Sequence, residues 1–129
     1  MESVLWYLGR VLLGGYFLFS GFHHFSNLGT MAGYAQSKGI PSAKAAVALT
    51  GVLLAIGGIS VLLNLYTSIG LTALVLFLIP ATFMMHQFWK IQDPMVKMGE
   101  MVNFTKNLAL LGGTLMTMAV PWPWPYALG

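Results

Sequence analysis

The chain has 129 residues, of which 57% are hydrophobic and 7% are charged, and it contains no cysteine. Soluble domains carry about 25% charged residues, so this composition indicates a membrane protein. The lack of cysteine excludes disulfides, thiol relays and cysteine-bound metal centres, and three acidic residues are too few for a carboxylate-bridged di-iron bundle. The formal net charge of +3 comes from scattered lysines without a basic stripe, so we expect no nucleic-acid partner.

Three apolar runs, at residues 4–25, 45–65 and 68–89, are each long enough to cross a bilayer as a helix. The first run lacks the small-residue cleavage site of a signal peptide, so we expect it to be retained as a span. Pro80 lies inside the third run and is expected to kink that helix, because proline has no backbone N–H to donate.

A fourth span is predicted at residues 94–120. Asp93 suits the N-cap of this helix, and Pro94 suits its first helical position. A short interfacial helix is predicted at 29–38, and the tail at 121–129 is rich in proline and in aromatic rings that suit a membrane interface. The predicted fold class is therefore an all-α membrane protein with one domain over 1–129. Its four transmembrane helices form an up-down antiparallel bundle, and the interfacial helix follows the first span.

The lysines predict how the protein is oriented. Five of them lie in or beside the connections that follow the first and third spans, whereas the opposite side has only one basic residue, Arg10. The five are Lys38, Lys44, Lys90, Lys97 and Lys106. The positive-inside rule then places these connections in the cytoplasm and both termini outside, in a bacterial inner membrane.

Polar side chains gather at the same end of the predicted bundle. They are His23, His24, His86, Asn103, Lys106 and Asn107. Polar groups are costly against lipid tails, so we expect them to face the interior of the bundle. Three interpretations stay open, in order of preference: hydrogen bonds between helices, a pocket for a quinone or lipid headgroup, and a haem held by His24 and His86. The sequence predicts no catalytic residue and no metal site.

Arg10 lies two turns into the first span, on the same helical stripe as His24. Two interpretations of Arg10 stay open. Either it extends to the outer headgroups, or it faces the interior and belongs to the headgroup site. The glycine pairs at 57–58 and 112–113 are predicted to let neighbouring helices approach closely.

Five blocks of the sequence carry a resemblance to a known family. They are Gly9-Arg10 with Ser20-Gly21-Phe22-His23; Tyr34 with Lys38-Gly39-Ile40-Pro41; Leu49-Thr50-Gly51 with Gly57-Gly58; His86-Gln87-Phe88-Trp89; and residues 104–113. In these blocks the chain resembles the DoxX family of small membrane proteins. The resemblance implies a four-helix membrane bundle and an association with quinone-linked redox systems, since relatives are named for subunits of a thiosulfate:quinone oxidoreductase.

Two residues depart from the pattern of that family. Leu54 stands where the family usually has a glutamate, and His24 stands where it often has a lysine. The resemblance therefore implies that Arg10 has lost its counter-ion and that a carboxylate able to handle protons is missing.

The favoured function is an accessory subunit of a quinone-linked membrane redox complex, with a quinone or lipid headgroup pocket on its cytoplasmic side. The alternative is a non-enzymatic assembly or scaffold protein that binds other membrane proteins. A stand-alone enzyme is the least favoured, because the chain has no motif for an electron carrier of its own. The expected partners are membrane lipids, together with other membrane subunits or a second copy of the chain.

Overall fold

The computed structural model describes residues 1–121, 123 and 124, and the described chain is helical. Its elements are α1 (Glu2–Ser26), α2 (Leu28–Ser37), α3 (Ala43–Leu63), α4 (Thr67–Pro80), the π-helical turn η1 (Ala81–Met85), the 3-10 turn η2 (Phe88–Lys90) and α5 (Pro94–Met118). The predicted all-α class is confirmed, and the predicted helix ends at 4–25, 29–38 and 45–65 are within two residues of the observed ones. As expected, the Asp93 side chain caps α5 by accepting hydrogen bonds from the backbone N–H groups of Met95 and Val96.

Three segments are long and apolar enough to cross a membrane: α1, α3 and the stretch Thr67–Lys90. Their outer faces carry exposed large hydrophobic side chains, such as Leu12, Phe19 and Phe22 on α1. Such continuous apolar surface is rare on soluble monomers and is typical of a helix in contact with lipid. α5 carries three charged residues and is not among the three segments, so the fourth span at 94–120 stays a prediction.

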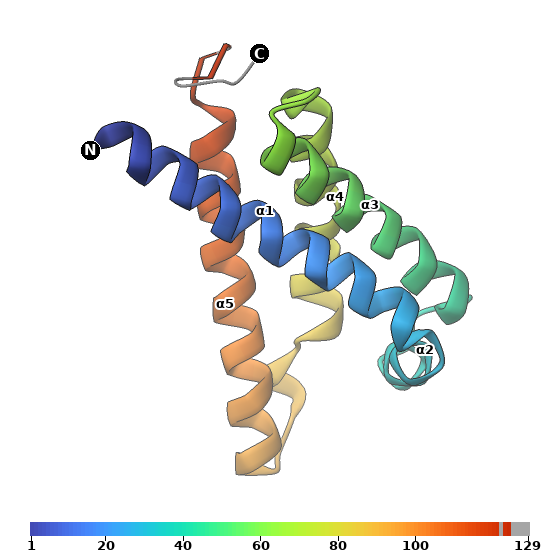
Figure 1. The fold of residues 1–129 in the computed structure, drawn as a ribbon. Coiled ribbons are helices and arrows are strands. Elements are labelled where there is room, and N and C mark those ends of the chain that lie inside the picture. Colours follow the sequence, from blue (N-terminus) through green and yellow to red (C-terminus); the bar gives the residue numbers. More distant parts are fainter. Residues whose placement is uncertain (122, 125–129) are drawn as a thin grey trace.

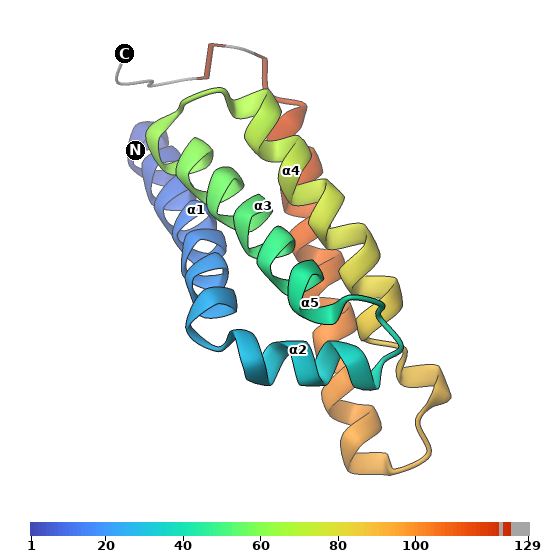
Figure 2. The same cartoon turned by 90° about the vertical axis from the view of Figure 1, so that its right-hand side faces the viewer.

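The helices form an open row, in which α1 packs on α3, α3 on α4 and α4 on α5. In the described chain α1 and α5 do not pack along each other, and α1 instead crosses α5 obliquely (Figure 1). A closed four-helix bundle is thus not confirmed. One end of the row, which we call the terminal end, holds the start of α1, the α3–α4 turn and Trp124. At the other end, the α2 end, α2 lies across the row and packs on α3 (Figure 2).

Glycines set the close contact between α1 and α3. A Cβ atom added to Gly58 would lie 2.5 Å from the backbone nitrogen of Leu18, and one added to Gly21 would lie 2.9 Å from the carbonyl oxygen of Gly51. These backbones therefore touch, as small residues permit in membranes. The prediction for 57–58 is confirmed. The prediction for 112–113 is wrong, because a Cβ atom at either position would meet no described atom within 4 Å.

The third predicted span, 68–89, is broken. Regular α-helix ends at Pro80, and the chain continues through the π-helical turn η1 to His86, which is not helical (φ −119°, ψ 54°). Proline removes one helical hydrogen bond, and a π-helical turn shifts the register of the following residues. His86 is therefore presented by a non-helical segment, whereas a kinked but continuous helix was expected.

Arg10 faces the interior, with 6% of its surface exposed. Its Nε donates to the carbonyl oxygen of Val61 at 3.1 Å, and its Nη2 donates to that of Leu62 at 2.9 Å. These carbonyls belong to the last turn of α3, whose final acceptors have no partner within the helix. Leu54 lies about two turns away on the same helix, and the partners of Arg10 are these backbone carbonyls and not a side-chain counter-ion.

The C-terminal tail contributes to the core at the terminal end. Trp124 is 4% exposed, its ring packs edge-on against Trp6 at 5.4 Å, and it lies 5.8 Å from the Arg10 guanidinium. This tryptophan is buried against the helices, and the placement of the tail's aromatic rings at a membrane interface stays a prediction. Residues 122 and 125–129 of the predicted tail lie outside the described residues.

Candidate functional site

A cavity of about 360 Å³ lies toward the α2 end. It is bordered by α1, α2, α3, α4, η1 and α5, and most of its lining is apolar. Aromatic walls come from Tyr16, Phe17 and Phe77. The polar lining residues are Ser20, His24, Tyr34, Thr50, His86, Lys106 and Asn107. The cavity thus combines an apolar body with a small set of polar groups.

His24 is held in place by its own helix. Its Nδ1 lies 2.9 Å from the carbonyl oxygen of Ser20, one turn earlier in α1, and its ring packs edge-on against Phe77 of α4 at 5.8 Å. Only 7% of the residue is exposed. A buried histidine fixed by one ring nitrogen leaves the other nitrogen available to a neighbour in the cavity.

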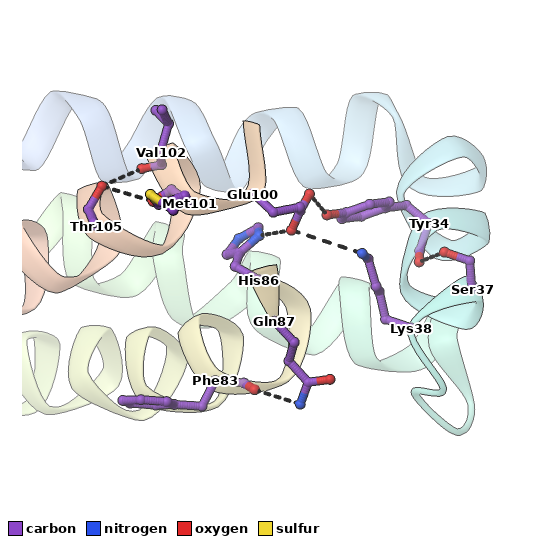
Figure 3. A network of polar contacts seen from close by, with 10 residues as sticks. All are labelled: Tyr34, Ser37, Lys38, Phe83, His86, Gln87, Glu100, Met101, Val102 and Thr105. Carbon is purple, nitrogen blue, oxygen red and sulfur yellow. Dashed lines mark hydrogen bonds and ion pairs between the residues drawn. The ribbon is translucent and has the colours of Figure 1, made fainter. Parts of the chain in front are cut away.

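His86 is held by a carboxylate from another helix. Its Nδ1 lies 2.9 Å from Oε2 of Glu100 on α5 (Figure 3). The break after Pro80 allows this contact, because His86 lies beyond the last helical turn of the α4 segment. The Glu100 carboxylate therefore orients the imidazole at the wall of the cavity, in the way that such carboxylates orient histidine at metal and catalytic sites.

Glu100 joins three segments of the chain at the α2 end. The Tyr34 hydroxyl of α2 donates to Oε1 at 2.5 Å, and Nζ of Lys38 lies 4.0 Å from Oε2 (Figure 3). Burial and the hydrogen bond to Glu100 raise the pKa of Tyr34 well above its usual range, so its hydroxyl stays protonated and remains a donor. The carboxylate thereby fastens α2 to α5 across the end of the cavity.

α5 supplies two further polar groups to the cavity. Nζ of Lys106 lies 5.9 Å from the ring centre of Tyr16, which connects α5 to α1 by a cation–π contact. Asn107 is 6% exposed, and its side chain has no hydrogen bond to any described residue. An amide that lines a cavity and has no protein partner can form hydrogen bonds with a bound molecule.

The structure separates the predicted site residues into two groups. His24, His86, Lys106 and Asn107 line the cavity. His23 and Asn103 do not: His23 is exposed and stacks on Phe19, with Nδ1 3.0 Å from the Asn27 side-chain nitrogen, and Asn103 is partly exposed. Arg10 is also outside the lining, because it binds the last turn of α3.

Sequence reasoning left Tyr34, Lys38 and Glu100 out of the site. Glu100 carried a usable signal, since it is the one acidic residue inside a predicted span, and an acid there needs a partner. Tyr34 and Lys38 are four residues apart on α2 and so share a helical face. Within the described residues, no group of three histidine, aspartate or glutamate side chains could hold a metal ion.

The two residues that depart from the resembled family pattern, His24 and Leu54, both line this cavity. Comparison with known proteins agrees with the resemblance: the family model of DoxX matches residues 5–87, which is more than half of the chain. No curated protein and no solved structure matches the chain. The chain belongs to the DoxX family.

Proposed function

We propose that this membrane protein is an accessory subunit of a quinone-linked redox complex and that its cavity binds a quinone or lipid headgroup. The observation that carries the proposal is a mostly apolar cavity of about 360 Å³ whose lining includes the Asn107 amide, which has no hydrogen bond to a described residue. Small-molecule sites are typically cavities of about 300–1,000 Å³ with apolar walls and a few placed polar groups. Both the size and the composition of this cavity fit that description.

The polar groups suit a headgroup with oxygen atoms. Neutral histidine and asparagine each offer a donor and an acceptor, and the Lys106 ammonium donates to a carbonyl, hydroxyl or phosphate oxygen. The walls of Phe17, Phe77 and Leu54 suit an aromatic ring or the start of an acyl or isoprenoid chain. The cavity is partly open, so such a chain can extend between α1 and α5, which do not pack along each other in the described part.

An accessory role fits the residues better than independent catalysis. The chain has no cysteine, and the described residues offer no cluster for a metal. The resemblance to quinone-linked subunits supplies the wider context, and electron transfer then belongs to a partner in the complex. In this proposal the α2 end, with its lysines, lies in the cytoplasm and both termini lie outside the inner membrane.

The test is the content of bound small molecules in the purified protein. The wild type, Asn107→Leu and Lys106→Ala are purified in mild detergent, and quinones and phospholipids are quantified by mass spectrometry. Each lost hydrogen bond should lower retention roughly two- to ten-fold. The matched control is His23→Ala, whose exposed ring lies outside the cavity and should leave retention unchanged. Equal retention in all four proteins would contradict the proposal.

The same purification tests the assembly-protein alternative, in which the exposed apolar faces of the helices bind other membrane proteins. An empty cavity together with stoichiometric copurified membrane proteins would favour that alternative.

A further inference from the structure

We propose that the cavity binds the reduced, hydroxyl-bearing form of its ligand, a quinol, more tightly than the corresponding quinone. The inference rests on the proposed function and names the ligand class of that same site. It follows from which ring nitrogen carries the hydrogen in the two histidines that line the cavity.

The tautomer of His24 follows from its backbone partner. The carbonyl oxygen of Ser20 can only accept a hydrogen bond, and it lies 2.9 Å from Nδ1 of His24. Nδ1 therefore carries the hydrogen and donates it. In the neutral ring Nε2 then has a free lone pair, so His24 offers the cavity a hydrogen-bond acceptor.

The tautomer of His86 follows from its carboxylate partner. Oε2 of the ionised Glu100 side chain only accepts, and it lies 2.9 Å from Nδ1 of His86. Nζ of Lys38 lies 4.0 Å from Oε2 of Glu100, and the Tyr34 hydroxyl donates to Oε1 at 2.5 Å. In the neutral ring of His86, as in that of His24, only one nitrogen carries a hydrogen. Nδ1 again carries the hydrogen, and Nε2 of His86 is a second acceptor.

The donors of the cavity come from α5. Lys106 can only donate, and Asn107 can do both. A quinol hydroxyl can pair with the donors and with the acceptors of the cavity. Its oxygen accepts from Lys106 or Asn107, and its hydrogen is donated to a histidine Nε2. A quinone carbonyl can only accept, so it displaces water from the histidine acceptors without offering them a donor. An unpaired buried acceptor disfavours binding.

The expected preference is about ten-fold for each histidine acceptor that the quinone leaves unpaired, which corresponds to about 1.4 kcal/mol. Because the site binds the reduced form more tightly, the midpoint potential of the bound ligand is raised, by about 30 mV for each ten-fold in this two-electron couple. A cavity with this preference stabilises the bound quinol against oxidation.

The test compares two probes, a decyl-substituted benzoquinone and its quinol. Dissociation constants for the purified full chain are measured by equilibrium dialysis under anaerobic conditions. We expect the wild type to bind the quinol at least about ten-fold more tightly than the quinone. The variants His24→Phe and His86→Phe should each bring the ratio closer to one, and the control His23→Phe should keep the wild-type ratio.

Glu100→Gln gives a readout that loss of structure cannot imitate. The Tyr34 hydroxyl should hold the carbonyl oxygen of the new amide, so that the amide nitrogen faces Nδ1 of His86. The imidazole then accepts at Nδ1 and carries its hydrogen on Nε2, which becomes a donor. Quinone binding should therefore strengthen relative to quinol binding, although a contact with α2 has been weakened.

The outcomes separate this inference from the proposed function. Equal affinity of the wild type for the two probes, or tighter quinone binding, would overturn the preference and leave the quinone site standing. An unchanged ratio in Glu100→Gln would overturn the tautomer argument. Failure of both probes to bind would remove the proposed quinone site itself, and the preference with it.

Discussion

The two ends of the protein each bury a charged side chain, and they do so with different kinds of partner. At the terminal end Arg10 donates to two backbone carbonyls of α3 and lies between the rings of Tyr7 and Trp124. At the α2 end Glu100 is held by side chains of Tyr34 and His86, with Lys38 nearby, beside a cavity.

This difference fits the proposal that the terminal end is structural and the α2 end binds a ligand. Backbone carbonyls in a packed helix have one fixed position, so the charge of Arg10 fixes where α1 lies on α3. Side chains on a short helix and on a broken helix end can adjust, and Tyr34 and His86 border a cavity that a ligand can enter. Ionisable groups in membrane segments mark functional sites most often where they border such a cavity.

The largest expected effect comes from disrupting the close contact between α1 and α3. Gly58→Val should destabilise the protein by roughly 3 kcal/mol, because the added atoms meet the backbone of α1 at Leu18 and Gly14 rather than a side chain that can move. The measurement is thermal unfolding in detergent, followed by circular dichroism. Gly113→Val is the matched control, because a Cβ atom there meets no described atom outside its own helix within 4 Å. Equal melting temperatures for the two variants would show that α1 and α3 are not in backbone contact.

Arg10→Met should lower stability by about 1–3 kcal/mol, because two carbonyls at the end of α3 lose their donors in a buried site. The substitution also removes Nη1 of Arg10, which is buried without a hydrogen-bond partner among the described residues. Removing this unpaired group offsets part of the cost. Arg10→Lys should restore part of the loss. The readouts are melting temperature and bound small molecules, and a change confined to bound molecules would contradict the structural role of this residue.

Tyr34→Phe should cost about 1 kcal/mol, because a hydrogen bond to a carboxylate is lost from a partly exposed residue. The effect should be local: hydrogen exchange of the α2 amides should speed up while exchange in α3 stays the same. Ser37→Ala is a control on the same helix, since its hydroxyl bonds only to the backbone of Tyr34. Faster exchange throughout the chain would contradict a local role in fastening α2.

The smallest expected effect is a loss of α2 docking at alkaline pH. The pKa of Tyr34 is raised in the folded protein by burial and by Glu100, whereas an unfolded tyrosine titrates near pH 10. Above about pH 10 the unfolded state therefore binds fewer protons than the folded state, and stability falls as pH rises. Exchange of the α2 amides, corrected for the intrinsic rate, should show this trend in the wild type and not in Tyr34→Phe.

The sequence predicted the helices well where the signals are local. Apolar runs and the pair Asp93-Pro94 place α1, α3 and the start of α5 within two residues. The break after Pro80 was expected only as a kink, because whether a proline bends or ends a helix depends on what can replace its lost hydrogen bond. The glycines at 112–113 look like those at 57–58, and only the position of the neighbouring helices distinguishes them.

The candidate site was predicted in part. Four residues that the sequence places at a similar depth in the membrane do line one cavity: His24, His86, Lys106 and Asn107. Depth depends on position along each helix, which can be read from the sequence. The same argument also included His23, which points away, because one residue turns a helix by about 100° and the interior face was not defined by the sequence. The contact of Glu100 with Tyr34 joins residues 66 positions apart and depends on how α2 folds back.

The central claim is that the α2 end binds a ligand and the terminal end holds the fold, and one paired measurement tests it most directly. Melting temperature and bound quinone and lipid are measured together for Arg10→Met, His86→Ala and Lys106→Ala. We predict a crossed pattern, in which Arg10→Met melts earliest and keeps its bound molecules, while the two cavity variants lose bound molecules and melt closer to the wild type, His86→Ala being lowered by the loss of its hydrogen bond to Glu100. Early melting of His86→Ala and Lys106→Ala with every bound molecule retained would contradict the account.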